Sequence, residues 1–183
     1  MDYLYIFIAV TIGNVALSDG ASCPELKLKE NFSVDKYLGN WYEIQSQPSI
    51  FQTIKSCLAS SYTMVGDTMH VASEGLDSSG SPATTTATLT IDPQNPAHMI
   101  TDFVPGVSPP FDIVDTDYDT FSCIHSCLSI MGMKTEFVFI YSRNRTLNPE
   151  AVKHCRSIFE SYGIDTGELV DVVQSNCHTH SDL

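Results

Sequence analysis

The stretch TFSCIHSCL places three residues that could bind a metal or react as thiols at alternate positions, Cys123, His125 and Cys127. Apolar and polar residues alternate along it, as in a β-strand. Four strand residues span roughly 13 Å, whereas a disulfide needs Cα atoms within about 7 Å, so Cys123 and Cys127 must find partners elsewhere. The same spacing holds the three side chains too far apart to share one ion. We therefore expect no metal site here.

The chain has six cysteines, and their chemistry depends on whether one of them stays free. A free thiol with a lowered pKa could act as an enzyme's nucleophile. In a secreted chain six cysteines instead favour a disulfide set, although six allow 15 pairings. The sequence contains no Gly-x-Ser-x-Gly, no His-Glu-x-x-His and no phosphate-binding loop. We expect that the protein is not an enzyme.

A further polar candidate is His98, which begins a candidate strand in PAHMITDF. It is either a solvated histidine at a strand end or a hydrogen-bonding group directed at a ligand. Its role depends on the fold that surrounds it.

The 183 residues, 43% of them hydrophobic, suffice for one well-packed domain. The formal net charge is −13, and the nine Lys and Arg are scattered along the chain. Nucleic acid and anionic membranes are therefore poor partners.

The first residues carry an apolar run from Tyr3 to about Leu17, which ends in a small-residue site at Ala16-Leu17-Ser18. This pattern predicts a signal peptide at 1–18 and a secreted, extracellular mature domain at 19–183. The run is short for a membrane span and no later segment comes close, so we expect no membrane insertion.

From Asn40 to Arg143 the chain reads as short strands separated by turn residues. The candidate strands are 41–47, 57–65, 68–76, 83–92, 98–103, 111–118, 120–128 and 134–142. Eight strands at hairpin spacing predict an all-β fold, an antiparallel barrel or sandwich.

One helix is predicted near the C-terminus, capped by Asn148, with Pro149 at its first position and Gly163 at its end. Cys155 falls on its apolar face, where it could bridge to the outside of the sheet. The last strand is apolar on both faces, which indicates a barrel with an outer helix and an inner lining. A small closed barrel of this kind either fills its interior or holds one ligand. We therefore expect a binding module.

At this point the sequence resembles the lipocalin family, in three motifs that occur in the family's order. The motifs are Gly39-x-Trp41 at the first strand, Thr116-Asp117-Tyr118, and Arg143 after the last strand. The resemblance implies an eight-stranded up-and-down barrel with one C-terminal helix packed outside. It also implies that Trp41 and Arg143 pack together at the closed end of the barrel, as structural residues.

Within the lipocalins, the chain is most similar to the crustacyanins, which bind carotenoids. The similar stretches are Phe51-Gln52-x-Ile54-x-x-Cys57, Ala97-His98-Met99, the strand with Cys123 and Cys127, and Glu136-Phe137-x-Phe139. The resemblance implies the bridges Cys23–Cys127, Cys57–Cys177 and Cys123–Cys155, which leave no free thiol. One departure is His125, where the family has tyrosine. We expect His125 to face outward with the two cysteines, as a surface histidine.

The resemblance implies a carotenoid ligand such as astaxanthin, held without a covalent bond. A hydrogen bond from His98 to its ring keto oxygen would shift the absorption to the red. The candidate ligand contacts are His98, Gln52, Phe51, Tyr62, Ser60, Phe103, Phe137 and Phe139. A carrier for a bilin, a retinoid or another lipophilic ligand is the alternative, because Ile113–Thr120 also resembles retinol-binding proteins.

The resemblance also implies a homologous lipocalin subunit as partner, in a heterodimer or a larger assembly. The loop from Val104 to Phe111 is a candidate contact for it, or else an ordinary proline-rich turn. Two sequons, at Asn31 and Asn144, are candidates for glycosylation.

Overall fold

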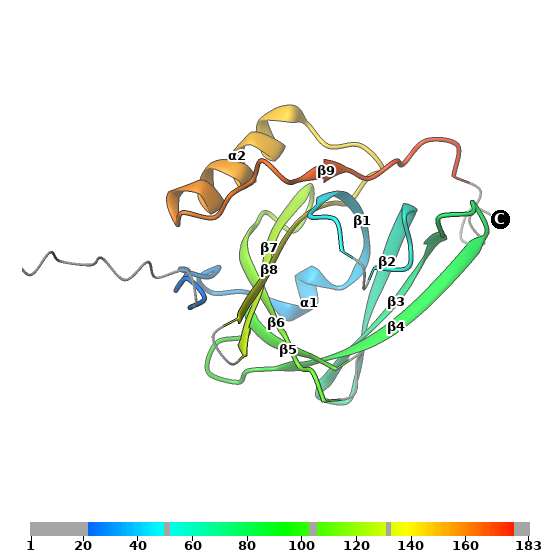
Figure 1. Cartoon of the computed structure of the whole chain (residues 1–183). Coiled ribbons are helices and arrows are strands. Elements are labelled where there is room, and N and C mark those ends of the chain that lie inside the picture. The colour runs from blue at the N-terminus through cyan, green and yellow to red at the C-terminus, as the bar shows by residue number, and fades with distance from the viewer. Residues whose placement is uncertain (1–21, 50–51, 103–105, 131–132, 178–183) are drawn as a thin grey trace, which may run out of the picture.

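The structure, a computed structural model, describes residues 22–49, 52–102, 106–130 and 133–177. Its main feature is a closed antiparallel barrel (Figure 1). The strands are β1 (Gly39–Ser46), β2 (Ser56–Val65), β3 (Thr68–Leu76), β4 (Pro82–Ile91), β5 (His98–Asp102), β6 (Pro110–Thr116), β7 (Phe121–Ile130) and β8 (Met133–Ser142). Each strand pairs with the next, and β1 pairs with both β2 and β8, which closes the barrel. The predicted up-and-down barrel is confirmed.

The strand register determines which side chains point into the barrel, because residues directly opposite each other share a face. Trp41 pairs with Ser60, Met69 with Leu89, and Ile124 with Phe139. Trp41, Met69, Leu89 and Ile124 belong to one buried cluster, which fills the interior at one end. A register shift between Glu43 and Gln45 turns Gln45 to the outside.

Helix α1 (Val34–Tyr37) closes this end of the barrel. The Tyr37 ring stacks on Trp41 with centroids 5.0 Å apart and meets Phe32 at 5.3 Å. The Trp41 indole donates a 2.8 Å hydrogen bond to the Tyr37 carbonyl oxygen, which ties the helix to β1. We call this end the closed end.

Helix α2 (Pro149–Ser161) lies against the outside of the barrel (Figure 1). The Asn148 side chain accepts a hydrogen bond from the Glu150 amide, as its predicted cap role requires. Cys155 and Phe159 are buried against Val138 and Ile140, which point outward from β8. The short strand β9 (Val170–Asp171) pairs with the outer edge of β1.

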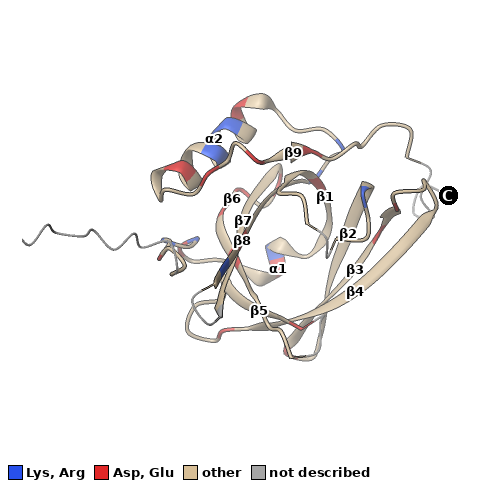
Figure 2. Ribbon diagram, viewed as in Figure 1, with Lys and Arg blue, Asp and Glu red and all other residues tan. Residues whose placement is uncertain are grey.

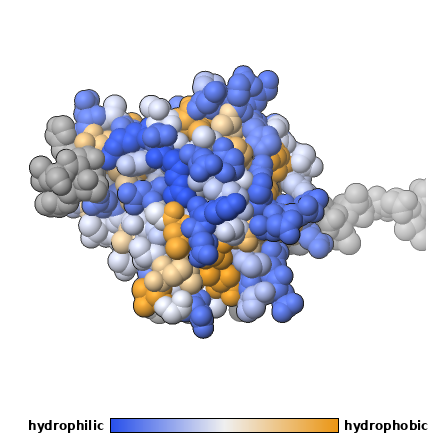
Figure 3. Space-filling view, turned by 180° about the vertical axis from the view of Figure 1, so that it is seen from behind, coloured by the Kyte–Doolittle hydropathy of each residue, from blue (hydrophilic) through white to orange (hydrophobic). Residues whose placement is uncertain are grey.

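Seen from behind, the surface is mostly hydrophilic, with hydrophobic patches toward the lower part of the view (Figure 3). Within the described ranges, neither helix has the length and apolar character that a bilayer span requires. The predicted signal peptide at 1–18 lies outside the described residues.

Candidate ligand-binding site inside the barrel

The interior of the barrel is open at the end opposite α1. Inward-facing side chains are buried near the closed end, but inward-facing Thr85, Ala87, Thr101, Phe137 and Phe139 are partly or fully exposed. An inward-facing side chain can be exposed only where the barrel holds a solvent-accessible hollow. The barrel therefore has an open lumen, whose mouth lies where β1, β3, β5 and β7 end and β2, β4, β6 and β8 begin.

Aromatic and small side chains line this lumen. The rings of Phe137 and Phe139 stack with centroids 6.4 Å apart on β8, and Phe139 meets Tyr141 at 6.2 Å. Across the barrel, the Tyr62 ring lies 6.3 Å from Phe111. Such a wall suits an apolar ligand.

The floor of the lumen, in contrast, is polar and centres on Glu43. The Gln52 amide donates a 2.7 Å hydrogen bond to the Glu43 carboxyl, and Ser46 and Tyr141 also hydrogen-bond to it. Tyr141 in turn bonds to Tyr62. We call Glu43, Gln52, Ser46, Tyr141 and Tyr62 the floor cluster.

The floor cluster favours uncharged forms of its acidic groups. Glu43 is 2% exposed, and this burial raises the pKa of its carboxyl, against the opposing effect of its hydrogen bonds. Burial likewise raises the pKa of Tyr62 and of Tyr141 well above the ordinary tyrosine value.

Glu43 is not among the ligand contacts predicted from the sequence. The signal was present, because Glu43 stands two residues after Trp41 in an alternating strand and so faces the same side.

Of the predicted ligand contacts, Gln52, Tyr62, Phe137 and Phe139 lie at the lumen as described above. Ser60 faces inward as well and hydrogen-bonds to Ser73 at 2.7 Å. Phe51 and Phe103 lie outside the described residues. Whether these side chains contact a ligand remains a prediction.

His98 lies on the other side of the sheet from this lumen. Its neighbour Met99 faces inward, and His98 pairs with Asp112, which pairs with His125 in the outward-facing row of β7. The His98 Nδ1 atom lies 2.5 Å from a carboxylate oxygen of Asp112. The predicted contact between His98 and a ligand therefore requires a ligand group at the outer face.

His125 differs from the prediction in one respect. It shares the outward face with Cys123 and Cys127, as expected, but it is 2% exposed and lies 3.0 Å from the Glu136 carboxylate. The expectation of a surface histidine was wrong, because the bridge from Cys127 to Cys23 brings the N-terminal segment onto this face.

His125, Cys127 and Glu136 have potential metal-ligand atoms within 4.8 Å of one another. The Cys127 sulfur, however, is bonded to Cys23 and cannot become a thiolate ligand while that bridge is intact. This arrangement offers no complete set of ligands for a metal ion.

All six cysteines form disulfides, in the pairs that the resemblance implied. These are Cys23–Cys127, Cys57–Cys177 and Cys123–Cys155. An enzyme mechanism that needs a free thiol in the lumen therefore has no residue to carry it.

The family-motif residues form the closed end rather than the ligand site. The Arg143 guanidinium lies 3.8 Å from the centroid of the Trp41 ring and donates to the carbonyl oxygens of Asn40 and Tyr118. Gly39 has a positive φ of 94°, which a larger residue would adopt only with strain.

The loop between β6 and β7 is held by side-chain hydrogen bonds to its own backbone. Asp117 accepts from the amides of Asp119, Thr120 and Phe121, and the Thr116 hydroxyl donates to the Phe121 carbonyl. The motif residues in this loop are therefore structural.

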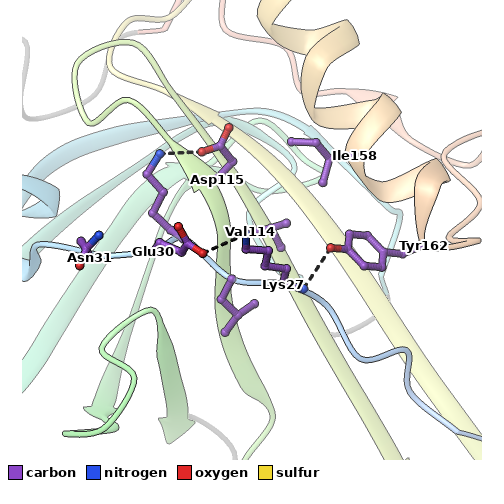
Figure 4. A pocket seen from close by; sticks show the side chains of 9 residues that line it. Lys27, Glu30, Asn31, Val114, Asp115, Ile158 and Tyr162 are labelled. Atoms are coloured by element: carbon purple, nitrogen blue, oxygen red, sulfur yellow. Dashed lines mark hydrogen bonds and ion pairs between the residues drawn. The ribbon is translucent and has the colours of Figure 1, made fainter.

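A second, shallow groove lies outside the barrel, between the N-terminal segment, β6 and α2, with a volume of about 420 Å³ (Figure 4). Its charged groups are paired with each other or with their neighbours. Lys29 lies 2.8 Å from Asp115, which also contacts His154, and Lys27 pairs with Glu30. Nothing in this groove is directed at a ligand. Asn31 at its edge and Asn144 are both exposed, and their glycosylation remains a prediction.

Comparisons with known proteins agree with this architecture. The mouse (Mus musculus) apolipoprotein D is 29% identical over 183 residues, covering 95% of this chain and 96% of the relative. The crustacyanin-A1 subunit of Homarus gammarus is 29% identical over 145 residues, covering 78% and 80% of the two chains. The crystal structure of lobster apocrustacyanin A1 superposes with a TM-score of 0.72 at 29% identity, covering 79% of this chain and 81% of that one. Residues 38–176 match the Lipocalin / cytosolic fatty-acid binding protein family, and with its closed barrel, outer helix and open lumen the chain belongs to this family as a lipocalin.

Proposed function

We propose that this protein is a secreted binding protein that holds a small hydrophobic pigment in its barrel, a carotenoid such as astaxanthin whose colour it shifts. The observation that carries the proposal is the open lumen, where the inward-facing Phe137 and Phe139 remain accessible from one end. The likeness to a crustacyanin subunit and to apocrustacyanin A1 supports a pigment as the ligand.

A carotenoid is a long apolar polyene with keto and hydroxyl groups on its end rings. The ring that enters first would meet the floor cluster, where Tyr62 and Gln52 offer hydrogen bonds. The polyene would lie along the Phe137 and Phe139 rings, which exclude water from it.

The lumen is shorter than the strands that enclose it, because its closed end is filled by Tyr37 and Trp41. Even the longest strands, with ten residues, measure only about 33 Å along their length. The far end of a long polyene would therefore extend beyond the mouth. A second, homologous lipocalin subunit would cover that end, and the loop that contains Val107 and Pro109 stands at this mouth. Val107 is 37% exposed.

In this arrangement His98 would contact a ligand only from the outer face, where the partner subunit brings a second pigment within reach. His98 would then polarise the keto oxygen and deepen the colour shift. We therefore expect the isolated chain to bind weakly and the assembly to show the full shift. Size-exclusion chromatography that yields a pigment-loaded monomer with the full shift would remove the partner from the proposal.

The test of the function is absorbance spectroscopy of the oxidised mature chain, refolded with astaxanthin, biliverdin or retinol. A large red shift with astaxanthin supports a carotenoid protein. No shift with astaxanthin, together with tight binding of retinol or biliverdin, would favour the alternative of a retinoid or bilin carrier. His98→Ala, measured in the assembly with the partner subunit, reports separately on the histidine, because this substitution leaves every inward-facing residue unchanged.

A further inference from the structure

We propose that the lumen selects its ligand by charge: it accepts molecules whose leading end is an uncharged hydroxyl or keto group and rejects carboxylates, with Glu43 as the specificity-determining residue. This inference rests on the proposed function, since it takes the lumen as the ligand site.

The first observation is the absence of a cation at the inward-facing positions of the eight described strands. Lys and Arg are sparse on the strands, which are mostly tan in Figure 2. The register assigns the lysine and the histidines of these strands to the outer face, because each pairs with an outward-facing residue or stands next to an inward-facing one; these residues are Lys134, His70, His98 and His125. Arg143 lies beyond the Trp41 ring at the closed end. A carboxylate that entered the lumen would therefore find no opposite charge among these side chains.

The second observation is that the floor already holds a buried carboxyl group. Glu43 is 2% exposed, and its hydrogen-bonding partners are an amide from the β1–β2 segment and two hydroxyl groups. The titratable groups that face it are tyrosines, namely Tyr141 from β8 and Tyr62 from β2. Neither of them carries a positive charge.

The physical consequence is a penalty for a second acidic group. Two neighbouring carboxyl groups in a buried site cannot both ionise, so a ligand carboxylate leaves at least one uncompensated negative charge at the floor. An uncharged hydroxyl or keto group avoids this penalty and can exchange hydrogen bonds with Gln52, Tyr62 or Tyr141. The preference separates retinol and carotenoids from fatty acids and from bilins that carry propionates.

The experiment compares retinol with retinoic acid, which share one apolar skeleton and differ in the end group. Binding is measured by quenching of Trp41, the single tryptophan of the chain, on the oxidised mature protein. At about pH 8 retinoic acid is anionic, and near pH 4.5 much of it is neutral. We expect retinol to bind at least about tenfold more tightly than retinoic acid at the higher pH, and we expect this ratio to shrink at the lower pH.

Two variants locate the effect. Glu43→Gln keeps the size of the side chain and one accepting oxygen, but it cannot ionise and its amide nitrogen adds a hydrogen-bond donor at the floor. It should therefore narrow the ratio of the two dissociation constants at pH 8 by at least about threefold, through tighter binding of retinoic acid. Asp102→Asn makes the same carboxyl-to-amide change at an exposed, outward-facing position of β5 and should leave the ratio unchanged.

Equal binding of the two ligands by the unmodified protein at pH 8 overturns charge selection and leaves the lumen site in place. An equal change in the ratio of retinol binding to retinoic acid binding in Glu43→Gln and Asp102→Asn also overturns charge selection. If neither retinol nor retinoic acid quenches Trp41 in any of the proteins, charge selection in the lumen is overturned, whereas the proposed function is decided separately by the absorbance shift of astaxanthin.

Discussion

Arg143 is expected to be the most important single side chain for holding the closed end together. Its guanidinium donates hydrogen bonds to the carbonyl oxygens of Tyr118, Asn40 and Lys36 at 2.8, 2.8 and 2.9 Å, and it covers the Trp41 ring at 3.8 Å. These contacts join the β6–β7 loop, the start of β1 and the end of α1. Arg143→Met removes every one of these hydrogen bonds while it keeps an apolar side chain over the ring.

The size of the expected loss follows from where these contacts lie. The bond to Tyr118 is partly buried and should contribute about 2 kcal/mol, whereas the two bonds at exposed atoms should contribute about 1 kcal/mol or less each. The cation–π contact adds about 1 kcal/mol. Because such contributions are not fully additive, we expect Arg143→Met to lower the free energy of unfolding by about 3 to 5 kcal/mol.

Equilibrium unfolding in urea, followed by Trp41 fluorescence and circular dichroism under non-reducing conditions, measures this loss. Lys153→Met is the matched control, because Lys153 is exposed on α2 and its removal should change the stability by less than about 0.5 kcal/mol. A loss below about 1 kcal/mol for Arg143→Met, or one equal to that of the control, would refute the assigned role.

Three further predictions concern the bridges and the buried acids. Replacing Cys123 and Cys155, which are 32 residues apart, with alanine should cost about 4 kcal/mol in the same unfolding assay, and a loss under about 1 kcal/mol would contradict it. Burial raises the pKa of Glu43, so as the pH rises the unfolded state releases this proton before the folded state does. The contribution of Glu43 to stability is therefore present below about pH 4.5 and is lost as the pH rises toward the folded pKa. Glu43→Gln should flatten that part of the curve of stability against pH. Burial alone would raise the pKa of Glu136, but its hydrogen bonds with His125 and Lys134 outweigh this effect and lower the pKa. The contribution of Glu136 to stability is therefore present above about pH 4.5 and is lost as the pH falls. If Glu136→Gln leaves the acidic part of the curve of stability against pH unchanged, this account is contradicted.

Most of the fold was predictable because the strands are short apolar or alternating runs bounded by turn residues. The predicted strand 68–76 coincides with β3, and the other seven agree with the structure to within two residues at each end. The capped helix was equally clear, since Asn148 and Pro149 are local signals that do not depend on distant contacts. Helix α1 and strand β9 are too short to show a periodic pattern in the sequence. Tertiary contacts determine where they form.

The candidate site was less accessible to sequence reasoning. In β5 both Met99 and Ile100 are apolar, so alternation could not show that His98 faces outward; the pairing with Asp112 decides it. The burial of His125 depends on a bridge to Cys23, about a hundred residues away in the chain. The role of Glu43 depends on its hydrogen bond with Gln52, nine residues later in the chain, which strand alternation does not reveal.

The most direct test of the central claim, that a pigment binds inside the barrel, is a titration with astaxanthin of three proteins, followed by its absorbance shift. Ala87→Phe fills the lumen from an inward-facing position of β4, and Thr86→Phe adds the same ring next to it on the outer face. We predict that Ala87→Phe weakens binding at least about tenfold, or about 1.4 kcal/mol, while Thr86→Phe binds like the unmodified chain. Undiminished binding by Ala87→Phe, or no binding by the unmodified chain, would contradict the account.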